Sequence, residues 1–215
     1  MKNEFLLCTL LALVFVTFPG CKSMKGVSQN LYSPPSNYEY EHSRIVLVEF
    51  AEPRECKEMG QRCTRQLAEN LSDMTTNVDP VVVTPDQINM SDPATALERG
   101  RISLDTLRMA SERYGGQAVM LGEITQFSPY ASLSAGVRIK IFSTSDASLE
   151  TSVSENYSAD DPQFRSYVKD YYERRSDSET CRFGPHLLLT SPRYFTLVVT
   201  DNIVREHIVG KPAGN

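Results

Sequence analysis

Hydrophobic and polar positions along this chain form patterns that predict five strands. The continuous apolar runs at 45–48 and 81–83 are typical of strands covered on both faces of a sheet, and the stretch QAVMLGEITQF at 117–127 predicts a third buried strand. Strict alternation of apolar and polar residues over 132–141 predicts a half-exposed antiparallel strand. The more polar stretch 149–157, which follows a turn, predicts an edge strand.

Apolar residues that recur every three or four positions predict five helices. Three of them span about 57–75, 92–99 and 103–114, and two more begin at Asp161 and Ser191. Several of these segments open with Asp or Ser directly before a proline, which is a common signature of a helix start. The stretch 195–200 in the last segment also fits a strand.

The order of these elements predicts the fold class. The order β-α-β-α-β-β-β, followed by two C-terminal helices, indicates an α/β (α+β) fold with a mixed sheet in a single domain of two or three layers. Two buried strands joined by a helix form a parallel unit, which is right-handed as a rule. We place the core domain at 44–157 and a helical extension, packed on that core, at 158–215.

The first 20 residues have the pattern of an export signal. An apolar run of 14 residues, 5–18, follows Lys2. A membrane-spanning helix needs about 20 residues, so this run is typical of the hydrophobic part of a signal peptide instead. We therefore predict a signal peptide at 1–20 and export from the cytoplasm.

The residues after the apolar run resemble the box that directs lipidation of bacterial lipoproteins. Phe18-Pro19-Gly20-Cys21 places a small residue directly before a cysteine. We predict that Cys21 becomes the first mature residue and carries the lipid, including palmitate, which attaches the chain to a membrane. Cleavage nearby by ordinary signal peptidase, with Cys21 unmodified, is the alternative. By resemblance to the sorting of enterobacterial lipoproteins, Lys22 in place of Asp favours the outer membrane, and we expect its periplasmic face. Residues 21–43 are predicted to form a flexible tether.

Composition and charge exclude two classes of protein. Apolar residues make up 40% of the chain and charged residues 23%, which excludes a wholly disordered protein. The 22 basic residues are outnumbered by 27 acidic ones, giving a net charge of −5. A nucleic-acid partner is therefore not expected, because such binding needs a basic face.

Three cysteines remain once the signal peptide and Cys21 are set aside. Cys56, Cys63 and Cys181 allow at most one disulfide and leave one thiol. Cys56 can pair with Cys63 only if Cys56 precedes the predicted helix, because seven helical residues separate Cα atoms by about 10.5 Å. A bridge from Cys181 to either of the others is equally compatible. Because the chain holds no CxxC and only three histidines, neither a metal site nor a cofactor is expected.

The chain lacks the common sequence signatures of catalytic residues. No G-x-S-x-G motif or glycine-rich phosphate loop is present, and His42, His186 and His207 have no nucleophile signature nearby. We therefore predict a protein that is not an enzyme and has no catalytic residues.

One cluster of residue types near the C-terminal end of the fourth predicted helix suggests a protein interface. Arginine and aromatic residues concentrate in protein contacts, although helical spacing favours core packing for the tyrosines here. The candidate interface residues are Arg174, Arg175, Arg182 and Phe183.

Residues 44–157 resemble a family of periplasmic lipoprotein domains. The likeness is carried by Val48-Glu49-Phe50, by Gly-x-Ala-x-x-x-Gly-x-Ile at 116–124, and by the hairpin around 137–141 with its Ser-Asp-Ala-Ser turn. The family includes the curli secretion-channel lipoprotein, the lipoprotein activator of a penicillin-binding protein and the Pel export lipoprotein, and its shape is related to the amino-terminal domain of the Tol-system propeller protein (anticodon-binding-domain-like). The resemblance implies a non-enzymatic interaction module, often tethered to the outer membrane by lipid.

These observations together predict the function in outline. We expect an outer-membrane-anchored periplasmic lipoprotein that supports assembly of an envelope or secretion complex. Its expected partners are the membrane, through the lipid, an envelope protein, and a second copy of the chain in a homo-oligomer. A regulator of a peptidoglycan synthase and an exported enzyme of unrecognised type are the alternatives.

Overall fold

The computed structural model describes most of the chain from His42 onward. The predicted signal peptide, Cys21 and nearly all of the predicted tether lie outside the described residues. The described ranges are 42–52, 58–75, 77–130, 132–175 and 184–209.

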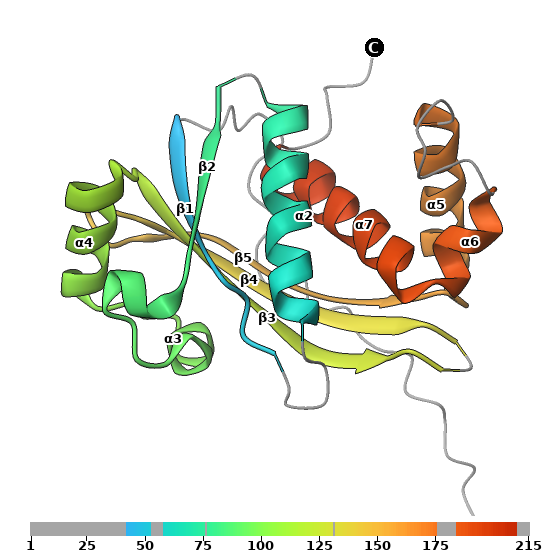
Figure 1. The fold of residues 1–215 in the computed structure, drawn as a ribbon, viewed down its shortest axis with the longest axis horizontal. Helices are drawn as coiled ribbons and strands as arrows, with labels where there is room; N and C mark the ends of the chain where they lie inside the picture. Colours follow the sequence, from blue (N-terminus) through green and yellow to red (C-terminus); the bar gives the residue numbers. More distant parts are fainter. Residues whose placement is uncertain (1–41, 53–57, 76, 131, 176–183, 210–215) are drawn as a thin grey trace, which may run out of the picture.

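Five strands form one sheet in the order β2-β1-β3-β4-β5 (Figure 1). β1 pairs in parallel with both β2 and β3, whereas β4 pairs antiparallel with both β3 and β5. The mixed sheet predicted from the apolar pattern is therefore confirmed. The strands are β1 (Arg44–Val48), β2 (Asp79–Val83), β3 (Ala118–Ser128), β4 (Ser134–Ser143) and β5 (Leu149–Ser158).

The helices agree with the predicted order, and the structure adds the short helix α6 and the 3-10 turn η1. Between β1 and β2 lies a single helix, two helices separate β2 from β3, and three follow β5. The helices are α2 (Met59–Met74), α3 (Pro93–Arg99), α4 (Leu104–Tyr114), α5 (Pro162–Arg174), α6 (Pro185–Thr190) and α7 (Pro192–Ile203), with a 3-10 turn η1 (Pro85–Ile88) and a π turn η3 (Val204–Ile208).

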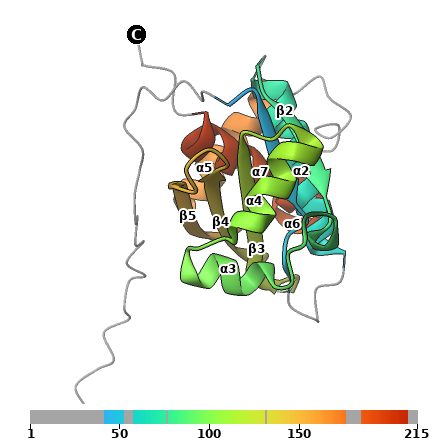
Figure 2. The same cartoon turned by 90° about the vertical axis from the view of Figure 1, so that its left-hand side faces the viewer.

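The sheet lies between two layers of helices, so the domain has three layers. Helices α3 and α4 cover one face, while α2 and α7 cover the other, with α5 and α6 beside them (Figures 1 and 2). Successive residues of β1 face opposite layers: Ile45 and Leu47 pack with α2 and α7, whereas Val46 and Val48 pack with α3 and α4. All four side chains are fully buried, which explains the uninterrupted apolar run.

Polar caps fix where the helices begin. The Asp92 carboxylate accepts a hydrogen bond from the Thr95 N–H at 3.1 Å at the start of α3. At the start of α4, the Ser103 hydroxyl accepts a hydrogen bond from the Thr106 N–H at 3.0 Å. At the start of α5, the Asp161 carboxylate accepts one from the Gln163 N–H at 2.8 Å. α4 then ends at Gly115, whose φ of 65° is a left-handed conformation that favours glycine.

The C-terminal region differs in one detail from the sequence prediction, and it confirms the predicted helix that follows Ser191. Three helices follow β5 instead of two, because α6 has only six residues, too few for a helical period to show. The stretch 195–200 is helical, since Phe195, Val198 and Val199 all face the same core as α2. The π turn η3 continues α7 to Ile208.

The predicted tether meets the folded domain at its last two residues. His42 Nε2 lies 2.7 Å from Glu150 Oε1 on β5, and the Ser43 N–H donates to Gln117 Oε1 at 2.7 Å. The folded part of the described chain therefore begins at His42.

Close packing at Gly122 gives a test of this core. Gly122 on β3 faces the Phe50 ring, and a Cβ atom added at this glycine would overlap the ring. We expect Gly122→Ala to lower the free energy of unfolding by about 1–3 kcal/mol, as overpacking of a core does, measured by urea denaturation. Thr125→Ala, at an exposed position of the same strand, is the control and should change it little. Equal stability of the two variants would contradict this packing.

Candidate functional site

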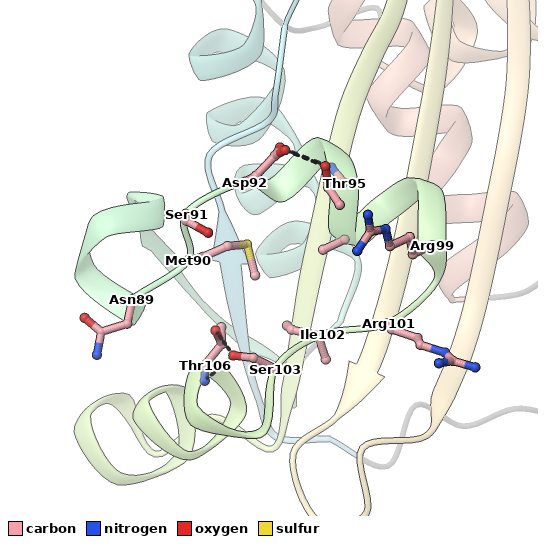
Figure 3. Close-up of a pocket in the computed structure, with 11 residues that line it drawn as sticks. Asn89, Met90, Ser91, Asp92, Thr95, Arg99, Arg101, Ile102, Ser103 and Thr106 are labelled. Atoms are coloured by element: carbon pink, nitrogen blue, oxygen red, sulfur yellow. Dashed lines mark hydrogen bonds between the residues drawn. The ribbon is translucent and has the colours of Figure 1, made fainter.

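A cavity of about 410 Å³ lies between η1, α3 and α4 (Figure 3). Its walls come from the loop that follows η1 and from the short loop that joins α3 to α4, together with residues of α3 and of the first turn of α4. Both loops lie on the side where β2 ends, and ligands of α/β proteins bind preferentially outside the carboxyl ends of parallel strands. The cavity is therefore the candidate functional site.

The floor of the cavity is largely apolar. Met90 is 6% exposed and Thr106 is 2% exposed, and the half-buried Ala96 and Ile102 complete the floor. Figure 3 shows Met90 and Ile102 pointing toward one another across this floor. Methionine adapts its shape to what it contacts, so such a floor can accept an apolar side chain of variable shape.

The rim is polar, and its carboxylate is already engaged. The Asp92 carboxylate accepts hydrogen bonds from both the Thr95 hydroxyl and the Thr95 N–H. These bonds lower the pKa of Asp92, the hydroxyl bond contributing most, so the group stays ionised and tied to its own helix. The Ser103 and Thr106 hydroxyls are likewise bonded to each other at 2.7 Å.

Two arginines on the rim, Arg99 and Arg101, form no close ion pair within the described ranges, although the charge of Arg99 also contributes to the lowered pKa of Asp92. Arg99 and Arg101 flank Gly100, and both are exposed. Among the described residues, no carboxylate oxygen lies within 4.0 Å of either guanidinium. In Figure 3 the Arg99 guanidinium points toward the cavity, whereas Arg101 extends away along the rim. The cavity thus combines an apolar floor with a locally positive rim, an arrangement suited to binding.

The buried carboxylate of Asp201 organises a second cluster, at the ends of α5 and α7. Asp201 is fully buried, and Tyr167 donates its hydroxyl to Asp201 Oδ2 at 2.5 Å. Arg174 Nη2 lies 3.2 Å from the same oxygen, and Arg175 Nη2 lies 3.8 Å from Oδ1. Arg205 Nε lies 3.8 Å from Oδ2. A single carboxylate therefore joins α5, α7 and η3.

The tyrosines of α5 hold these guanidiniums in place. Arg174 stacks over the Tyr167 ring at 5.4 Å, and Arg175 stacks over the Tyr171 ring at 5.6 Å. Burial, and then the hydrogen bond to Asp201, raise the pKa of Tyr167 well above its ordinary value, so the hydroxyl remains a donor.

The structure brings together two of the four candidate interface residues. Arg174 and Arg175 both reach Asp201. Arg182 and Phe183 lie outside the described residues. A role of these four residues in an interface stays a prediction.

The three histidines lie in separate parts of the domain. His42 contacts Glu150, and His207 Nε2 lies 3.9 Å from Glu155 Oε1. His186 lines a smaller cavity of about 270 Å³ beside the start of α5. The structure therefore does not bring the histidines into one constellation.

Cys63 is part of the core. Its side chain is 2% exposed on α2, and burial raises the pKa of the thiol to about 12. Cys56 and Cys181 lie outside the described residues, so a disulfide stays a prediction. Within the described ranges no three His, Cys, Asp or Glu side chains are grouped to hold a metal ion. No helix in those ranges has the length and apolarity of a membrane span.

Sequence reasoning missed the cavity, because its lining comes from three short elements without a motif. The sequence also does not show that Leu104, next to the lining residue Ser103 in the first turn of α4, is 74% exposed. In the sequence it stands on the same helix face as Leu107, which suggests a core position, but Leu107 is buried and Leu104 is not.

No protein-family model and no curated protein sequence matches the chain. Among solved structures, a PelC dodecamer from Paraburkholderia phytofirmans is similar over 54% of this chain and 71% of its own, with 14% identity and a TM-score of 0.38. Lipoprotein GNA1162 from Neisseria meningitidis is similar over 64% and 99%, with 11% identity and a TM-score of 0.41. The LpoB C-terminal domain from Salmonella enterica is similar over 54% and 83%, with 10% identity and a TM-score of 0.36. These likenesses concern the fold alone.

Replacing the buried carboxylate tests the second cluster. We expect Asp201→Asn to lower the free energy of unfolding by about 2–4 kcal/mol. This loss is somewhat smaller than the loss expected when a fully buried ion pair is broken, because the arginine side chains around Asp201 are about one-third exposed. Asp73→Asn is the matched control, because Asp73 also contacts Arg175, at 3.5 Å, but is exposed. Asp73→Asn should lower the free energy of unfolding by less than about 1 kcal/mol, measured by the same urea denaturation. Similar costs for both variants would contradict the central role of Asp201.

The half-buried imidazole of His207 predicts a dependence of stability on pH. Burial lowers the pKa of His207 below its ordinary value of 6.5, against the opposing carboxylates of Glu155 and Glu206. The unfolded chain therefore takes up a proton first as the pH falls, and stability present above pH 6.5 is lost below it. We expect His207→Gln to flatten the fall in unfolding free energy from about pH 7 to about pH 5. His186→Gln, at an exposed position, is the control; an unchanged slope in the His207 variant would refute the prediction.

Proposed function

We propose that this protein is an exported lipoprotein of the cell envelope whose folded domain binds a protein partner and catalyses no reaction. The observation that carries the proposal is the sequence Phe18-Pro19-Gly20-Cys21 at the end of a 14-residue apolar run. Lipid on Cys21 would hold the domain at a membrane, and Lys22 after it favours the periplasmic face of the outer membrane.

The distance between the lipid and the domain supports this proposal. The described part of the chain begins at His42, and about 20 residues lie between it and Cys21 in the sequence. A flexible segment of that length has an end-to-end distance of roughly 25 Å. The domain can therefore turn its surface toward a partner while it stays at the membrane.

The chemistry of the candidate site supports binding over catalysis. The cavity lining contains no histidine or cysteine, and its carboxylate, Asp92, is engaged by Thr95. An apolar floor with a polar, positive rim is the composition of a contact site for a protein segment.

Metabolic labelling with palmitate tests the anchor. We expect the label on the full-length protein and on Cys8→Ser, because Cys8 lies within the apolar run of the signal. Cys21→Ser should carry no label and leave the membrane fraction, since it lacks the acylated residue. Label that persists in Cys21→Ser, or an unsubstituted protein without label, would contradict the proposed lipidation of Cys21.

The partner is tested by chemical cross-linking in the native envelope, followed by purification of the full chain. A penicillin-binding protein among the products would narrow the function to regulation of a peptidoglycan synthase. A second copy of this chain would support the predicted homo-oligomer. Turnover of a small molecule by the purified protein would contradict a purely binding role.

A further inference from the structure

We infer that the cavity between η1, α3 and α4 receives an acidic segment of the partner protein, which inserts one apolar side chain next to a carboxylate. The inference rests on the proposed function, because it names the chemistry of the partner that the envelope lipoprotein binds. The cavity and the exposed Leu104 beside it form what we call the anchor surface, defined by Met90, Ala96, Arg99, Arg101, Ile102 and Leu104.

The apolar part of the anchor surface is larger than the cavity. Leu104 follows Ser103, which lines the cavity, and is 74% exposed. Met90 and Ile102 face each other on the floor below. An aromatic side chain buries about 150–250 Å² when it is covered. Such a side chain can lie on Met90 and Ile102.

The charged part of the anchor surface is positive, although the protein as a whole is acidic. The lining contains two guanidinium groups, those of Arg99 and Arg101, and one carboxylate, that of Asp92. The carboxylate accepts two hydrogen bonds from Thr95. Lys140 Nζ on β4 also lies 3.1 Å from the position of a Cβ atom built on Gly100. A local positive site on a chain of net charge −5 favours a partner that carries negative charge at this point.

The nature of the surface favours a protein segment over a lipid headgroup. Recognition of an anionic membrane surface uses clusters of about 4–8 basic residues. Here two arginines stand beside a cavity with hydroxyl and amide groups on its rim, from Ser91 and Asn89. That combination of one apolar anchor and a few polar contacts is typical of the centre of a protein interface.

The second cavity lacks this combination. It includes Tyr130, which is 82% exposed, but its arginine is engaged. Arg165 donates to the Ala159 carbonyl at 2.6 Å and lies 3.2 Å from Asp160 Oδ1. No guanidinium in that lining is left for an acidic partner, so the anchor surface is the better candidate.

A photo-crosslinking residue placed at Ile102 of the full-length lipoprotein tests the inference in the native envelope. We expect one major cross-linked protein, and mass spectrometry should locate the cross-link on an apolar residue within three positions of an Asp or Glu. Arg99→Glu and Leu104→Glu should each lower the yield at least tenfold, a loss equal to about 1.4 kcal/mol of binding free energy. In the Arg99→Glu variant, changing the partner's acidic residue to Lys should restore the yield of the cross-link, because the two charges then attract each other again.

Matched variants on other surfaces make the test specific. Arg65→Glu changes an exposed arginine on α2, and Leu149→Glu changes a leucine that is 44% exposed at the start of β5. Both should keep the yield within twofold of the unsubstituted protein. Circular dichroism confirms that each variant is folded, and Ser91→Glu offers a second way to add negative charge at the rim.

The outcomes separate failure of the inference from failure of the proposed function. Cross-links from a probe at Leu149 but none from Ile102 would overturn the inference and leave partner binding intact. A captured segment without acidic residues, a captured lipid, or a yield unchanged in Arg99→Glu and Leu104→Glu would overturn it equally. No protein cross-link from either probe, with Cys21 unmodified, would overturn the proposed function as well.

Discussion

The constraint on which the rest of the structure depends is that β1 must be covered on both faces. Its residues Ile45–Val48 are fully buried, and alternate side chains enter two different cores. Neither core can form without its own layer of helices, because a strand of this kind exposes apolar surface on whichever face is bare. The chain meets this need by sending α2 across one face and α3 with α4 across the other.

That constraint also places the candidate site. The chain leaves β2 at Val83 and must pass to the face that α4 covers, through η1 and α3. These elements are too short to fill the space between them, and the cavity is what remains. The sheet itself is polar on this face farther along β4, where Arg138 and Glu123 pair at 3.1 Å. At the cavity, by contrast, the core between the sheet and helices α3 and α4 extends to the surface through Met90, Ala96 and Ile102.

The elements that sequence analysis predicted well are those whose signal is local. Buried strands, the Asp-Pro starts of α3 and α5 and the Gly115 end of α4 depend on residues within one turn of the boundary. The features it missed depend on distant residues. The floor of the cavity brings together Met90 and Ile102, and the role of Arg174 depends on Asp201, 27 positions later. A periodic pattern along the sequence does not predict contacts between residues that are this far apart.

A single anchor surface of this size also explains why a membrane tether would matter for the proposed function. One apolar side chain and one or two ion pairs correspond to a small interface, and interfaces below about 1,200 Å² are mostly weak and transient. Holding both proteins at one membrane confines them to a thin layer and so raises the effective concentration of each for the other. A contact too weak to persist between freely diffusing proteins then becomes sufficient. The lipid on Cys21 and the anchor surface at Arg99 would therefore act as two parts of one binding device.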